Sequence, residues 1–151
     1  MKQNQTIITN SSKETQLFAE KLARNMHGGE VICLYGDLGY GKTTFIQGFA
    51  RGLGLEGRII SPTFIIMRSY QANSKIQDSR FKNFYHIDLY RINTEQEIID
   101  LGLHELLNNS ENIIAIEWPE KMGKLLPKNR IDIIFEYLDE DKRKIVIQEN
   151  E

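Results

Sequence analysis

The residues best able to do chemistry form one eight-residue run in the first third of the chain. Two glycines, a lysine and a threonine stand there at the spacing G-x-x-x-x-G-K-[ST], in Gly36-Asp37-Leu38-Gly39-Tyr40-Gly41-Lys42-Thr43. Glycines allow a tight turn whose backbone N–H groups converge on phosphate oxygens. The lysine brings a full charge to the β- and γ-phosphates of a nucleotide, and the threonine hydroxyl can bind Mg²⁺. The pattern predicts a nucleotide-binding phosphate loop; the alternative is an ordinary glycine-rich turn with a surface lysine.

A phosphate loop needs acidic side chains to hold its metal ion. Asp88 and Glu117 end two apolar, strand-like runs, at residues 84–88 and 112–117. If these strands lie parallel to the strand before Gly36, both carboxylates emerge at the sheet edge where open α/β sheets bind ligands. We predict that Asp88 orients Mg²⁺ and that Glu117 binds the metal or positions water. The alternative for each is a solvated acid at the end of a strand.

Four further side chains carry weaker signals. Thr63 lies in a break between extended segments, where it is either a switch residue that brings a hydroxyl to the metal or γ-phosphate or an ordinary turn threonine. Trp118, the single tryptophan, is by itself more typical of a core than of a ligand contact. His86 shares a strand face with the first candidate carboxylate, and packing is its expected role. Cys33, inside an apolar strand, is predicted to be a core residue and not a nucleophile.

The elements that must position these side chains follow from hydrophobic periodicity and turn residues. Ser11 with Glu14, and Thr94 with Glu97, have the capping-box spacing that marks the start of a helix. Helices are predicted from these two caps to about residues 28 and 107, and at 42–53 and 120–126. Extended segments are predicted at 6–9, 31–35, 59–60, 64–70, 84–88, 112–117, 130–138 and 143–148.

Strands that alternate with helices indicate an α/β fold. We predict a P-loop NTPase-like three-layer sandwich with a mixed central sheet and an antiparallel C-terminal hairpin that turns at residues 139–142. The polar stretch 71–82 is predicted to be a loop or a hairpin tip. The whole chain, residues 1–151, is expected to be a single domain.

Composition restricts the class of protein further. The 19 Lys and Arg residues and 21 Asp and Glu residues give a net charge of −2, which argues against a protein that mainly holds nucleic acid by its phosphates. A single cysteine cannot form an intrachain disulfide and suits a reducing compartment. No apolar run approaches the ~20 residues that a membrane helix needs, and no signal peptide is evident. A cytoplasmic protein without membrane association is expected.

Taken together, several segments resemble the TsaE (YjeE) family, small P-loop ATPases of bacterial tRNA modification. In chain order these segments are Gly36–Thr44, Ser61-Pro62-Thr63-Phe64, His86-Ile87-Asp88-Leu89-Tyr90-Arg91, Asp100-Leu101-Gly102-Leu103 and Glu117-Trp118-Pro119-Glu120. Many ATPases share the first segment, whereas Ser-Pro-Thr-Phe, Asp-Leu-Tyr-Arg and Glu-Trp-Pro-Glu are much more specific. Two features depart from the family: Tyr40 replaces a usually small residue, and the polar stretch 71–82 is longer than the usual connection.

The resemblance implies binding of ATP and Mg²⁺ and a low, partner-dependent ATPase activity. The activity would serve a complex that installs threonylcarbamoyl on adenosine 37 of tRNAs reading ANN codons. The partners would be the TsaD and TsaB proteins, tRNA would be met only through the complex, and the chain alone would be a monomer. The implied nucleotide contacts are Asp37, Leu38, Gly39, Tyr40, Gly41, Lys42, Thr43, Thr44, Thr63 and Trp118. The implied metal-site residues are Thr43, Asp88 and Glu117, and the implied catalytic residues are Lys42, Asp88 and Glu117.

Two other functions share the phosphate loop. A small-molecule kinase would also need an acceptor pocket and an arginine-bearing lid; Arg68, Arg80 and Arg91 are available, but no lid-like segment with paired arginines is evident. A nucleotide-gated interaction module would differ from the ATPase only in its negligible rate of hydrolysis. A GTPase is disfavoured because the base-reading N/T-K-x-D pattern is absent and no D-x-x-G follows Asp88.

Overall fold

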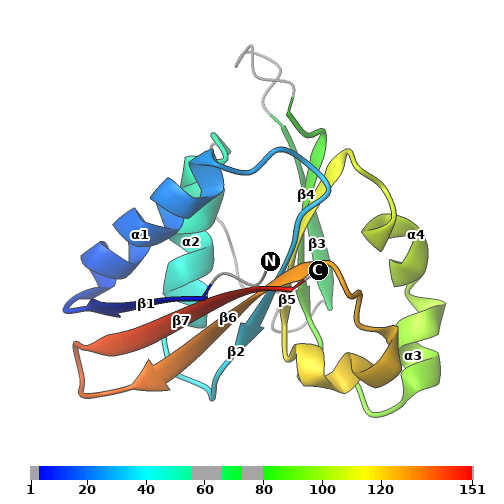
Figure 1. Cartoon of the computed structure of the whole chain (residues 1–151). Helices are drawn as coiled ribbons and strands as arrows, with labels where there is room; N and C mark the ends of the chain where they lie inside the picture. Colours follow the sequence, from blue (N-terminus) through cyan, green and yellow to red (C-terminus); the bar gives the residue numbers. More distant parts are fainter. Residues whose placement is uncertain (1–3, 56–65, 73–79, 151) are drawn as a thin grey trace.

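The computed structural model describes residues 4–55, 66–72 and 80–150, and these residues form one mixed β-sheet (Figure 1). Its seven strands within the described residues have the order β1-β7-β6-β2-β5-β4-β3. Strands β4, β5, β2 and β6 are parallel neighbours, whereas β7 is antiparallel to β6 and β1, and β3 is antiparallel to β4. The strands are β1 (Asn4–Thr9), β2 (Val31–Tyr35), β3 (Met67–Gln71), β4 (Asn83–Asp88), β5 (Asn112–Glu117), β6 (Arg130–Tyr137) and β7 (Arg143–Asn150).

Helices cover both faces of this sheet. Helices α1 (Ser12–Arg24) and α2 (Lys42–Gly52) lie on one face, and α3 (Glu95–Asp100), α4 (Leu103–Leu107) and the 3₁₀ helix η1 (Pro119–Leu125) lie on the other (Figure 1). This confirms the predicted three-layer α/β sandwich with an antiparallel C-terminal hairpin. Among the described helices, none has the length and apolarity needed to cross a membrane.

The central strand β2 divides its side chains between two apolar cores. Ile32 and Leu34 pack with Phe45 and Phe49 of α2, whereas Val31 and Cys33 pack into the core on the opposite face. This alternation explains the continuous apolar run, because a strand covered on both faces has no solvent side. Cys33 is fully buried, and burial together with the Asp132 carboxylate raises its pKa to about 12. The prediction that Cys33 is a core residue is therefore confirmed.

The two predicted helix caps form with one difference from the simple capping box. The hydroxyls of Ser11 and Thr94 accept hydrogen bonds from the backbone N–H groups of Glu14 and Glu97. Each glutamate carboxylate reaches back to the N–H of the residue before the cap; for Glu14 this partner is Asn10, at 2.6 Å. At the start of each helix, backbone N–H groups both before and after the cap residue therefore have side-chain hydrogen-bond acceptors.

Several predicted boundaries were wrong. The helix expected from Thr94 to residue 107 is divided into α3 and α4 because Gly102 adopts a left-handed conformation (φ 73°). The helix expected at 120–126 is a 3₁₀ helix that begins at Pro119. Gln71, expected at the start of the polar loop, is the last residue of β3, which pairs antiparallel with β4. Residues 59–60, 63 and 73–79 lie outside the described part of the chain.

Helix α2, which carries the phosphate loop at its start, packs closely on α1 through glycine. A Cβ atom added to Gly48 would lie 2.3 Å from the backbone oxygen of Gln16. We expect Gly48→Ala to reduce the free energy of unfolding by about 1–3 kcal/mol, and Tm by roughly 2–10 °C. The backbone clash outweighs the roughly 1 kcal/mol that alanine adds by helix propensity. Thermal unfolding measures this, with Lys21→Ala at an exposed position of α1 as the control; an unchanged Tm for Gly48→Ala would contradict the close packing.

Candidate functional site

The predicted phosphate loop lies between the end of β2 at Tyr35 and the start of α2 at Lys42. Gly39 and Gly41 have φ angles of 81° and 97°, in the left-handed region where a side chain is strained. Gly41 is also the N-terminal cap residue of α2. The free N–H groups at this helix start, and the positive end of its dipole, face the loop. The loop and helix together have the form of an anion site.

The Lys42 side chain turns back over this loop. Its Nζ donates a hydrogen bond to the backbone oxygen of Gly36 at 2.5 Å and lies 4.2 Å from the centre of the Trp118 ring. The residue is buried, and burial lowers the pKa of the ammonium group, while the nearby carboxylates of Glu117 and Asp88 oppose this shift. A cation is therefore held at the mouth of the loop by a carbonyl and an aromatic face.

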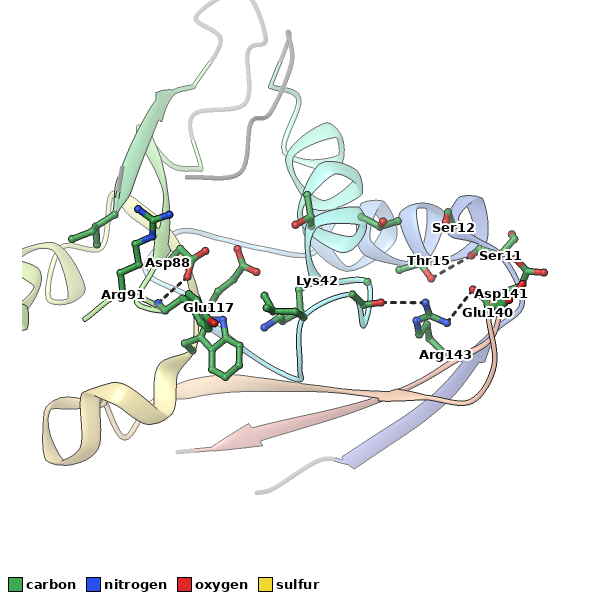
Figure 2. Close-up of a pocket in the computed structure, with 18 residues that line it drawn as sticks. Ser11, Ser12, Thr15, Lys42, Asp88, Arg91, Glu117, Glu140, Asp141 and Arg143 are labelled. Atoms are coloured by element: carbon green, nitrogen blue, oxygen red, sulfur yellow. Dashed lines mark hydrogen bonds between the residues drawn. The ribbon is translucent and has the colours of Figure 1, made fainter. Parts of the chain in front are cut away.

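The two candidate carboxylates meet beside the loop, as the sequence predicts. Asp88 and Glu117 are paired residues at the ends of the parallel strands β4 and β5, and Glu117 also pairs with Leu34 of β2 (Figure 2). Asp88 is half-buried, and its Oδ1 accepts a hydrogen bond from the N–H of Tyr90 at 3.0 Å. Burial raises the pKa of the Asp88 carboxyl, and the Tyr90 N–H partly opposes this. Two acidic groups and one lysine thus share one sheet edge.

His86 makes a contact that the sequence analysis did not predict. Its Nε2 lies 2.7 Å from Oε2 of Glu117, and both residues are buried. The parallel register explains this contact, because His86 stands opposite Ala115, two residues before Glu117. The expectation of simple packing was therefore incomplete. The period-two spacing of His86 and Asp88 was the available signal, but only the strand pairing brings Glu117 within reach.

Trp118 has a strained backbone that directs its ring to this site. It is the only non-glycine residue with a positive φ in the described chain, at φ 58° and ψ 47°. Such conformations cost energy and gather at functional sites. The ring lies beneath Lys42 and has its centre 5.2 Å from that of Tyr90. Trp118 is only partly buried and packs against the core on this face of the sheet, so the ring both joins the core and lies beside the loop.

A single pocket connects these groups with the other end of the loop (Figure 2). It has a volume of about 580 Å³, within the range of small-molecule sites. It runs from Asp88 and Glu117, past the loop and Thr43, to the start of α1 and the turn between β6 and β7. The predicted nucleotide contacts that line it are Leu38, Gly39, Gly41, Lys42, Thr43, Thr44 and Trp118. Asp37 and Tyr40 are not in this lining, and Thr63 lies outside the described residues.

Comparison with known proteins agrees with this geometry. The family model "Threonylcarbamoyl adenosine biosynthesis protein TsaE" matches residues 9–145. The chain belongs to the TsaE family. It is 39% identical to the "tRNA threonylcarbamoyladenosine biosynthesis protein TsaE" of Rickettsia bellii over 93% of this chain and 92% of that protein. The Bacillus subtilis protein of the same name is 36% identical over 91% of this chain and 80% of its own length.

The fold of a solved TsaE-family structure also matches. The crystal structure of Bacillus subtilis YdiB has a TM-score of 0.80 and 28% sequence identity, covering all of this chain and 88% of that one. The resemblance inferred from the motifs is thus confirmed. The TsaE motifs Gly36–Thr44, Asp88–Arg91 and Glu117–Glu120 come from separate elements and meet at one edge of the sheet.

Tyr40, the residue that departs from the TsaE pattern, points out of the phosphate loop. Its ring packs against that of Tyr137 at the end of β6, with the ring centres 5.8 Å apart. A large side chain is therefore accommodated here without filling the pocket. Arg143, at the start of β7, also contacts the loop and lines the pocket. No local sequence pattern indicated Arg143, because it is 103 residues from Tyr40.

Proposed function

We propose that this chain binds ATP with Mg²⁺ and hydrolyses it slowly, as the ATPase component in forming threonylcarbamoyl on adenosine 37 of tRNAs reading ANN codons. Its partners are the TsaD and TsaB proteins, and it meets tRNA only through their complex. The observation that carries this proposal is the meeting of Lys42, Asp88 and Glu117 at the mouth of a glycine-rich loop in one pocket. Membership of the TsaE family supplies the pathway.

The loop and Lys42 bind the phosphates in this proposal. The N–H groups at the start of α2 donate to phosphate oxygens, and the Lys42 ammonium exchanges its bond with the Gly36 oxygen for one with the β- or γ-phosphate. The pocket then leads to Ser11, Ser12 and the turn between β6 and β7, whose hydroxyl and carboxylate groups offer partners for the ribose and base. The full chain, residues 1–151, acts as one domain.

The side chains present fit a magnesium ion. Thr43 and Asp88 offer a hydroxyl and a carboxylate in the pocket, both oxygen donors of the kind Mg²⁺ prefers. The described residues contain no group of three or more His, Cys, Asp or Glu that could hold a metal ion. Mg²⁺ usually needs only one or two carboxylates beside the phosphates. When bound, Mg²⁺ neutralises charge that develops on the phosphate oxygens.

Glu117 is the residue that positions the attacking water. Its carboxylate is held by His86 on one side and lies near Lys42 on the other, so its orientation is set before the nucleotide arrives. A carboxylate fixed in this way can orient a water molecule and accept its proton, which lowers the barrier without strengthening nucleotide binding. Asp88, fixed by the Tyr90 N–H, orients the metal site.

The test is phosphate release from Mg-ATP by the purified chain, alone and with TsaD and TsaB. We expect slow release from the chain alone and a marked increase with both partners. Formation of ADP and a phosphorylated product only when a small-molecule acceptor is added would favour a kinase, and binding without phosphate release under any condition would favour a nucleotide-gated module. Either result would overturn the proposed ATPase function.

A further inference from the structure

One arginine links the phosphate loop to the turn between β6 and β7. Nε and Nη2 of Arg143 donate hydrogen bonds to the backbone oxygens of Tyr40 and Gly39, at 3.2 and 3.3 Å. Nη1 donates to three backbone oxygens of the turn, those of Asp139, Glu140 and Lys142. Figure 2 shows Arg143 between the loop and this turn, with dashed lines to both. A single guanidinium group thus joins two loops that are far apart in sequence.

The turn that contacts Arg143 is itself held by internal hydrogen bonds. The Asp139 carboxylate accepts hydrogen bonds from the backbone N–H groups of Asp141 and Lys142, at 2.9 and 2.8 Å. The guanidinium group also lies 4.7 Å from the centre of the Tyr137 ring, against which the Tyr40 ring packs. Both the turn and the aromatic pair therefore fix the position of Arg143 relative to the loop.

The bonds to Arg143 set the orientation of two peptide groups in the loop. A trans peptide is planar, so its carbonyl and N–H point in opposite directions. The Tyr40 carbonyl belongs to the same peptide as the Gly41 N–H, and the Gly39 carbonyl to the same peptide as the Tyr40 N–H. The Tyr40 N–H closes a turn onto the Asp37 oxygen at 3.2 Å, and the Gly41 N–H is directed away from Arg143. Arg143 therefore presents the Gly41 N–H as a free donor at the helix start.

The loop needs such support because it is rich in glycine. Gly39 and Gly41 have no Cβ atom to restrict their backbone, and ordering them only when a ligand binds would weaken the affinity. We propose that Arg143 is a positioning residue for nucleotide binding, which holds the Gly39–Tyr40 and Tyr40–Gly41 peptides in the phosphate-binding orientation. This inference rests on the proposed function, since the ligand is the nucleotide phosphate.

The first test needs no nucleotide. Hydrogen–deuterium exchange of the peptide that covers residues 36–44 is measured in the wild type and in Arg143→Met, at a temperature well below the Tm of each. We expect exchange at least about fivefold faster in the variant, because the Gly39 and Tyr40 carbonyls lose the guanidinium donor that fixes their peptide groups. The matched control is Arg80→Met just before β4, whose guanidinium donates to the Arg24 and Met26 oxygens at the opposite end of that strand from Asp88. Equal exchange in wild type and Arg143→Met overturns the inference.

The second test measures the affinity for ADP and for a non-hydrolysable ATP analogue by calorimetry. Arg143→Met is expected to weaken both by about tenfold, and Arg143→Lys is expected to recover less than half of this loss because an ammonium lacks the planar fork. Arg80→Met should retain wild-type affinity. Wild-type affinity in a folded Arg143→Met protein overturns the inference. If the wild type itself binds neither nucleotide, the proposed function fails, and the exchange measurement still decides whether Arg143 orders the loop.

Discussion

Lys42→Ala is expected to raise the dissociation constant for ATP by about 10- to 150-fold. A hydrogen bond to a charged group contributes about 1.5–3 kcal/mol, and each 1.4 kcal/mol is a factor of ten in affinity. The Lys42 ammonium group already lies over the loop, between the Gly36 oxygen and the Trp118 ring. The side chain therefore needs little rearrangement to reach a phosphate. Its burial keeps competing water away, which strengthens the contact.

Calorimetric titration with a non-hydrolysable ATP analogue measures the Lys42 effect. Lys42→Met is the companion variant, because it keeps most of the apolar stem that packs near Trp118 and removes only the charge. The control is Lys82→Ala, since Lys82 forms an exposed ion pair with Glu111 just before β4, at the opposite end of that strand from Asp88. If both Lys42 variants fold and bind the analogue as tightly as the wild type does, Lys42 is not a phosphate ligand.

Glu117→Gln is expected to slow ATP hydrolysis by about 100-fold or more while nucleotide affinity changes by no more than about threefold. A group that orients water and accepts its proton acts in the transition state and contributes about 10²–10⁴ in rate. Glutamine keeps the size of the side chain and a hydrogen-bonding partner for the buried His86. Alanine at this position would leave the buried His86 without that partner, which costs about 1–3 kcal/mol of folding stability. A lower rate in that variant could then come from lost stability as well as from lost catalysis.

Single-turnover hydrolysis with TsaD and TsaB present measures the Glu117 effect, and calorimetry measures the affinity. The control is Glu105→Gln, which removes an exposed carboxylate in α4 that does not line the pocket. It should leave both rate and affinity close to those of the wild type. A loss of affinity as large as the loss of rate in Glu117→Gln would assign Glu117 to the metal site or to the structure of the pocket.

Most of the elements could be predicted from the sequence because their signals are local. The apolar runs at residues 31–35 and 112–117 coincide with β2 and β5, since strands covered on both faces must be apolar throughout. The two helix caps are likewise local, because each depends on side chains within four residues. The errors occurred where one residue changes the backbone. Gly102 ends α3, and the strained Trp118 precedes the 3₁₀ turn that replaces an expected α-helix.

The sequence by itself determined the phosphate loop, because all of its parts are adjacent in the chain. The backbone has one local geometry where a strand is followed by glycines, a lysine and a helix. The tertiary structure alone decided which distant side chains complete the site. His86 reaches Glu117 through the register of β4 with β5, and Arg143 reaches the loop because β7 returns antiparallel beside β6. The physical reason is that hydrophobic periodicity states which face of a strand is buried, but not which strand lies beside it. Contacts across more than thirty residues therefore depend on strand order and register, which only the folded sheet specifies.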